Sequence, residues 1–168
     1  MRKKLFYYTL AGILFTSVIG TLSHFIYEWS GFNFYAGFFV PVSESTWEHM
    51  KMIFFPMLIY CSFENIMLKK YYPCLPCANA AAILTGTFSI PVIFYTYTGI
   101  LGTNYLPLDI LTFFAGVIIG FICGFRLTLK KIGKTHCKWL NAAILLLFIC
   151  FIVFTLYPPD MGIFKNPA

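Results

Sequence analysis

The chain has 168 residues, of which 60% are hydrophobic and only 11% are charged. A soluble domain of this length needs a polar surface, and this composition cannot supply one, so a soluble globular protein is excluded. In a soluble protein the net charge of +6 would suggest nucleic acid as a partner. Here the placement of the basic residues reports membrane topology instead, and we expect a lipid bilayer and no nucleic acid.

A hydrocarbon core about 30 Å thick takes roughly 20 helical residues to cross. Five windows are long and apolar enough: Leu5–Tyr27, Trp47–Leu68, Asn79–Tyr97, Leu106–Phe125 and Trp139–Tyr157. They use most of the chain, so the sequence predicts one all-α integral membrane domain over residues 1–168, a polytopic bundle of five transmembrane helices. The first window starts like a signal peptide, but its apolar run is too long and no small-x-small cleavage site follows, so we expect an uncleaved helix.

The basic residues predict the orientation of the bundle. Ten of the twelve lysines and arginines precede the first span, end the second, or lie between the fourth and fifth. With five spans these places share one side, which the positive-inside rule makes cytoplasmic, whereas a four-span map would split them. We therefore expect the N-terminus inside and the C-terminus outside.

Polar residues of the first two spans predict a site near the outer surface. Ser17, Thr21, His24 and Glu28 recur at helical spacing, and a polar stripe of this kind should face the bundle interior or a watery cavity. The second span opens with Glu44, Ser45, Glu48 and His49, where Ser45 and Glu48 also form a capping box. Because consecutive antiparallel spans are neighbours, the two groups should meet.

The predicted cluster holds two imidazoles and three carboxylates: His24, Glu28, Glu44, Glu48 and His49. Such side chains ligate zinc, iron or manganese, and they also relay protons. His24, Glu28, Glu48 and His49 are the candidate ligands of a divalent metal ion, although HxxxE and ExxxEH are each weak signals. A purely structural polar cluster stays open as the alternative.

Four other features have two interpretations each. Cys74, Cys77, His136 and Cys137 are one thiol-rich zinc ligand set on the cytoplasmic side, or interfacial residues without a role. Gly116, Gly120 and Gly124 lie on one helix face, which packs within the chain or binds a second copy or another membrane protein. Glu64 pairs with a basic residue such as Lys69, or is a second carboxylate on a cation path. The apolar segment 31–42 is interfacial or re-entrant, or a loop on the helix ends.

Two motifs carry a resemblance to a known family. Gly20–Gly31 reads GTLSHFIYEWSG, and Pro41–Lys51 reads PVSESTWEHMK, followed by Phe55-Pro56. The chain resembles a family of small uncharacterised bacterial integral membrane proteins with the patterns GTxxHFxYEWSG and PVNESxWEHxK. Ser43 stands where that family usually has Asn. The tail, with Tyr157-Pro158-Pro159 and then Phe164-Lys165-Asn166-Pro167, resembles its C-terminal pattern, with Asn166 where an Asp is usual. The resemblance implies a multi-pass protein of the bacterial cytoplasmic membrane and supplies no activity.

Three functions from different classes follow as hypotheses. The first is an outward-facing His/Glu site that binds a cation, a metal ion or protons, for transport or sensing. The second is a membrane-embedded hydrolase, in which the same groups activate a water against a lipid-like substrate under the aromatic segment. The third is a non-catalytic subunit that binds a partner through its glycine-rich helix face.

Overall fold

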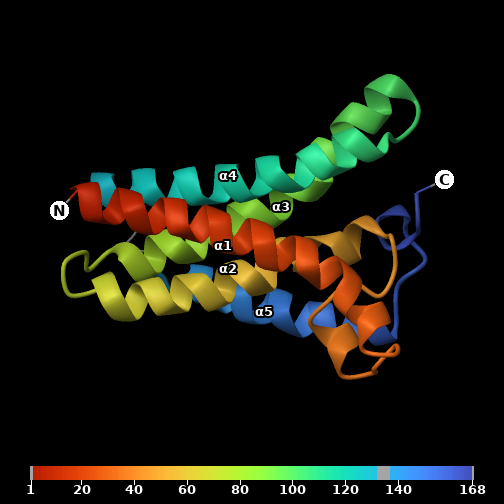
Figure 1. The fold of residues 1–168 in the computed structure, drawn as a ribbon, viewed down its shortest axis with the longest axis horizontal. Coiled ribbons are helices and arrows are strands. Elements are labelled where there is room, and N and C mark those ends of the chain that lie inside the picture. The colour runs from red at the N-terminus through yellow and green to blue at the C-terminus, as the bar shows by residue number, and fades with distance from the viewer. Residues whose placement is uncertain (1, 132–136, 168) are drawn as a thin grey trace.

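The protein is described by a computed structural model that covers residues 2–131 and 137–167 (Figure 1). Its elements are α1 (Arg2–Trp29), η1 (Ala36–Phe38), α2 (Thr46–Leu68), α3 (Leu75–Leu101), α4 (Leu106–Lys130), α5 (Cys137–Leu156) and η3 (Gly162–Phe164). All regular structure in these ranges is helical, and five of the helices are long and apolar enough to cross a membrane. The prediction of an all-α bundle with five spans is therefore confirmed.

Several helices extend beyond the predicted spans, for reasons that local residues explain. α3 begins four residues before the predicted Asn79, with Pro76 in its first turn, where a missing N–H costs nothing. It continues past Tyr97 to Leu101, where Gly102 ends it in the left-handed conformation with φ of 77°. α4 likewise carries a proline in its first turn.

The five helices lie side by side along the long axis, with the two chain ends at opposite ends of the bundle (Figure 1). The N-terminus and the connection from α2 to α3 share one end, which we call the basic end because Arg2, Lys3, Lys4, Lys69 and Lys70 lie there. The opposite end holds the connection from α1 to α2 and the C-terminal segment. We call it the acidic end, after Glu28, Glu44, Glu48, Asp109 and Asp160.

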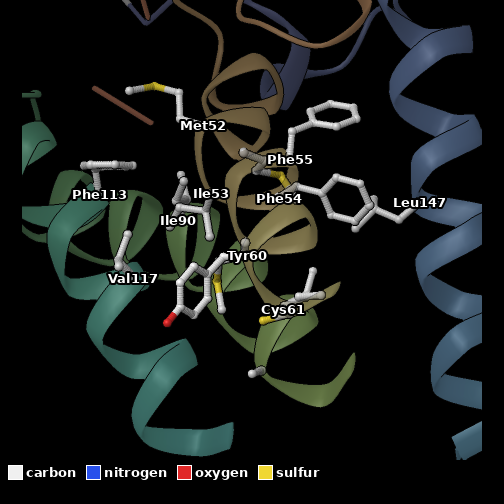
Figure 2. Packing of buried hydrophobic residues seen from close by; sticks show 14 of the residues in the cluster. Met52, Ile53, Phe54, Phe55, Tyr60, Cys61, Ile90, Phe113, Val117 and Leu147 are labelled. Carbon is white, nitrogen blue, oxygen red and sulfur yellow. The ribbon is translucent and has the colours of Figure 1, made fainter. Parts of the chain in front are cut away.

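α2 is the central helix, and it packs against each of the other four. In its most apolar 18-residue window 61% of the residues are buried, against 11% in α5, so α5 is the peripheral helix. Ile53, Phe54 and Met57 of α2 are completely buried. Figure 2 shows this core, with Val117 of α4 on one side of α2 and Leu147 of α5 on the other. An apolar residue on every side of α2 is what this central position requires.

The face of α1 that enters the bundle differs from the predicted polar stripe. Ser17 and His24 of that stripe are half-buried, whereas Thr21 and Glu28 are exposed, so the stripe as a whole does not face the bundle interior. The buried face carries small residues instead, namely Thr9, Gly12, Thr16, Gly20 and Ser23. A Cβ at Gly20 would lie 2.5 Å from the Met52 carbonyl oxygen, so close packing on α2 selects small residues here. Thr9 and Ser23 donate hydrogen bonds to carbonyls of their own helix, which satisfies them inside the bundle.

The glycine face of α4 packs on α3 within the chain. A Cβ at Gly120 would lie 2.9 Å from the Ala82 carbonyl oxygen, and one at Gly116 would lie 3.1 Å from that of Gly86. Gly124 meets the Ala82 side chain in the same way, at 3.0 Å. The three glycines therefore let two backbones approach closely, and a partner could reach this face only by displacing α3.

Candidate functional site

The start of α2 is fixed by a helix cap that also orients a histidine. Ser45 has extended backbone angles, and its hydroxyl accepts a hydrogen bond of 3.3 Å from the Glu48 N–H. One turn into the helix, His49 Nδ1 lies 3.0 Å from the Ser45 carbonyl oxygen. A carbonyl only accepts, so Nδ1 is the nitrogen that donates here, and Nε2 is the one that offers a lone pair to a metal ion.

Three of the five predicted site residues meet at the acidic end. His49 Nε2 lies 3.5 Å from one carboxylate oxygen of Glu44, and His24 Nε2 lies 3.7 Å from the other. The two imidazole rings are 5.4 Å apart between centroids. Both histidines are about one-third exposed and Glu44 is more exposed, at 64% of its side chain, so the group is reachable from the surface.

The spacing of this group suits a metal ion. His24, Glu44 and His49 each offer one ligand atom, and all three atoms lie within 4.8 Å of one another. Two ligands held about 2.1 Å from a tetrahedral zinc ion are about 3.4 Å apart, so small side-chain movements would close the site. Three protein ligands would leave a fourth position for water. In the part of the chain that the structure describes, this is the only group of His, Cys, Asp and Glu with such spacing.

The other two predicted site residues stand apart from this group. Glu28 is exposed at the end of α1, and the metal-sized group does not include it. Glu48 is buried and turns away, into the bundle. Its carboxylate accepts hydrogen bonds from the Val42 N–H at 3.0 Å and from the Thr155 hydroxyl at 3.2 Å. Glu44, which the sequence did not propose as a metal ligand, occupies the place between the histidines.

Lys51 explains the direction of Glu48, and sequence reasoning missed it. Its ammonium lies 2.6 Å from the Glu48 carboxylate, and the lysine side chain is completely buried. It also donates to the Gly37 carbonyl at 2.9 Å and to the Thr155 hydroxyl at 2.6 Å. These bonds join α2, the segment before it and α5 in one clamp. The signal was present in the sequence as a carboxylate and a lysine three residues apart on a helix.

The apolar segment 31–42 is a loop at the acidic end with one 3-10 turn, η1, which contacts α1 and α5. Gly37 and Val40 are buried, and the Phe39 ring packs against Phe55 and Phe148 at centroid distances of 5.3 and 6.4 Å. Phe32, Phe34 and Tyr35 are exposed. The segment therefore packs one aromatic ring against the bundle and presents three others at the surface of the acidic end.

The predicted thiol site is only partly assembled. Cys77 and Cys137 are hydrogen-bonded to each other, whereas the Cys74 thiol donates to the Thr128 carbonyl of α4 at 3.5 Å. His136 lies outside the described residues. The six cysteines are all free thiols.

Glu64 is buried between helices near the basic end. Its carboxylate accepts a hydrogen bond of 2.9 Å from the Asn79 amide, which also donates to Asn65 at 3.1 Å. Lys69 is exposed, and among the described residues Glu64 forms no ion pair. An amide of α3, and not a lysine, is therefore the partner that holds this carboxyl group.

Comparison with known proteins identifies the family. The model of a family of unknown function, DUF6512, matches residues 1–168, the whole of the chain printed here. The chain belongs to this family. No curated protein and no solved structure matches it. The DUF6512 match agrees with the resemblance to an uncharacterised family and extends it from the first third of the chain to all of it, but it assigns no activity.

Proposed function

We propose that the protein is a multi-pass protein of the bacterial cytoplasmic membrane that binds a divalent transition-metal ion at its outer face. The single observation that carries this proposal is the group of His24, Glu44 and His49, whose ligand atoms lie within 4.8 Å of one another. Two imidazoles and one carboxylate favour zinc and its neighbours over magnesium or calcium, which prefer oxygen ligands. The hydrogen bond from His49 Nδ1 to the Ser45 carbonyl supports the proposal, since a metal-bound imidazole usually donates the N–H of its other nitrogen.

The surroundings of the site favour sensing over passage of the ion. Beyond the buried Glu48–Lys51 pair the bundle is apolar, and Ile53 and Phe54 of α2 are completely buried there. The three ligands come from α1, from the loop that precedes α2, and from α2 itself. A bound ion would therefore hold these three parts together and order the loop that carries Glu44. The position of this loop at the membrane surface would then depend on whether the site holds an ion.

Zinc titration of the purified protein tests the proposal. Isothermal titration calorimetry in detergent, on protein purified without a polyhistidine tag, should show one zinc ion per chain. His24→Ala and His49→Ala should each weaken binding by more than about 100-fold, because even the loss of an outer-shell partner costs 10- to 100-fold. Magnesium should give no heat at the same concentration. Wild-type protein without a zinc isotherm, or histidine variants with wild-type affinity, would contradict a metal site.

The proposal that the site faces outward depends on the positive charges of the basic end. Positive residues favour the cytoplasmic side, and the His24 cluster lies at the opposite, acidic end. Alkaline phosphatase, which is active only outside the cytoplasm, should be active when fused after residue 167 and inactive when fused after Lys70. The reverse pattern would place the metal group in the cytoplasm and remove the extracytoplasmic part of the proposal.

A further inference from the structure

A cavity of about 300 Å³ lies between α2, α3 and α5, in the half of the bundle nearest the basic end. This volume is at the lower end of the range found for small-ligand pockets. Ser62, Asn141 and Leu145 line the cavity and are exposed, so it opens on the outer surface of the bundle, which in a membrane faces lipid. The cavity is at the other end of the molecule from the metal group and shares no residue with it.

The lining of the cavity has a polar part and an apolar part. Asn65, Asn79 and Asn141 supply three amides, one from each helix. Further from the basic end the walls are apolar, and they include Leu58, Ile83 and Phe148. Asn79 already donates its two amide hydrogens, to Glu64 and to Asn65. Amides are rare and costly in lipid-facing positions, so the N–H groups of Asn65 and Asn141 are the ones at this opening that need polar partners. The gradient from amide to hydrocarbon matches an amphiphilic molecule with its polar group toward the basic end.

Two lysines continue the polar part toward the membrane surface. Lys69 follows Asn65 by four residues, and Lys138 precedes Asn141 by three, so each lies on the same helix face as its asparagine. One helical turn, about 5.4 Å, separates each pair along the axis. Both lysines are exposed. Two ammonium groups beyond an amide-lined opening between helices form the kind of basic site that binds anionic lipid headgroups.

We propose that this cavity binds one anionic phospholipid of the leaflet at the basic end. Part of one of its two acyl chains would lie against the apolar walls near Ile83 and Phe148, and its ester oxygens would accept hydrogen bonds from the amides of Asn65 and Asn141. Its phosphate would lie between Lys69 and Lys138. The peripheral position of α5 would then reflect a helix that packs partly on a bound lipid.

Native mass spectrometry with two lipids tests this site. Protein is mixed with equal amounts of phosphatidylglycerol and phosphatidylcholine that carry the same acyl chains, and the retained lipid is measured. Wild-type protein should retain one phosphatidylglycerol per chain in preference to phosphatidylcholine. The double variant Lys69→Ala/Lys138→Ala should lose at least tenfold of this preference, since each juxtamembrane lysine contributes about fivefold. Lys130→Ala/Lys131→Ala is the matched control: it removes the same charge from the end of α4, which does not line the cavity, and should keep the preference.

A second variant tests the apolar part. Ala80 lines the cavity and is buried, so Ala80→Phe should fill part of the volume and reduce the retained lipid of both kinds. The lysine variants change only exposed side chains and keep the test decisive if Ala80→Phe does not fold. Equal retention of the two lipids by wild-type protein, or an unchanged preference in Lys69→Ala/Lys138→Ala, would overturn the proposal. Zinc binding should be the same in all these variants, so the lipid-site proposal and the metal-site proposal can be rejected independently of each other.

Discussion

Replacing Lys51 by methionine should lower the free energy of unfolding by about 3–5 kcal/mol, the usual cost of removing one partner from a buried ion pair. The substitution keeps the volume and the hydrocarbon of the side chain. It leaves the Glu48 carboxylate buried without its cation, and it leaves the Gly37 carbonyl without its donor. The loop before α2 and the end of α5 should loosen together, because the Lys51 ammonium bonds to both. Thermal and denaturant unfolding in detergent, followed by circular dichroism, measure the loss.

The chain offers a matched control for this variant. Lys165 also pairs with a carboxylate, Asp160, at 2.7 Å, but both side chains are mostly exposed. Lys165→Met should therefore change stability by less than about 1 kcal/mol. The double variant Lys51→Met/Glu48→Met should recover part of the loss, since an apolar pair no longer leaves a buried charge unpaired. Equal effects of Lys51→Met and Lys165→Met would show that the buried pair does not hold the acidic end together.

The number of spans was predictable from hydropathy together with the placement of the basic residues, which a four-span map would split. A run of about 20 apolar residues has few alternatives to a transmembrane helix, and the five runs of this chain became α1 to α5. The boundaries were less predictable: helices extend beyond the hydrocarbon core until a residue such as Gly102 ends them. The glycines of α4 were also informative, since close packing of two membrane helices needs small residues on one face.

The interior face of α1 could not be read from polarity. The prediction assumed that Thr21 and Glu28 avoid lipid, but Glu28 lies one residue before the end of α1, where a polar side chain reaches water. The interior is chosen by size as well as polarity, and Gly12 and Gly20 fit against α2 and α4 where larger side chains do not. A period of 3.6 residues shows that a set of residues shares one face of a helix, but it does not show which face packs against the neighbouring helices.

The candidate site was predictable as a location and only partly as a set of residues. Adjacent antiparallel spans bring the end of α1 to the start of α2, and this places His24 near His49. The direction of each carboxylate depends on competing partners. Glu48 accepts hydrogen bonds from groups of the segment before α2 and of α5, and the second of these is more than 100 residues away in the sequence. Such a long-range choice follows from packing and has no local signal.

The two exposed glutamates of the acidic end provide the sharpest test of the proposed metal site. Glu44→Gln should weaken zinc binding by about 10- to 100-fold, because a neutral amide replaces an anionic ligand that lies between the two histidines. The protein should keep its stability, since Glu44 is exposed and its helix cap is made by Ser45. Calorimetric titration with zinc measures the affinity, and thermal unfolding without metal verifies the fold.

Glu28→Gln is the control, because it makes the same chemical change at the same end of the bundle, one turn after His24. Glu28 is exposed and outside the metal-sized group, so only its long-range charge is lost. Screened by water and salt, that charge should alter zinc affinity by less than about threefold. The sequence pattern alone makes the opposite prediction, since it proposes Glu28 as a ligand and not Glu44. A larger loss in Glu28→Gln than in Glu44→Gln would therefore reject the arrangement of His24, Glu44 and His49 as the binding site.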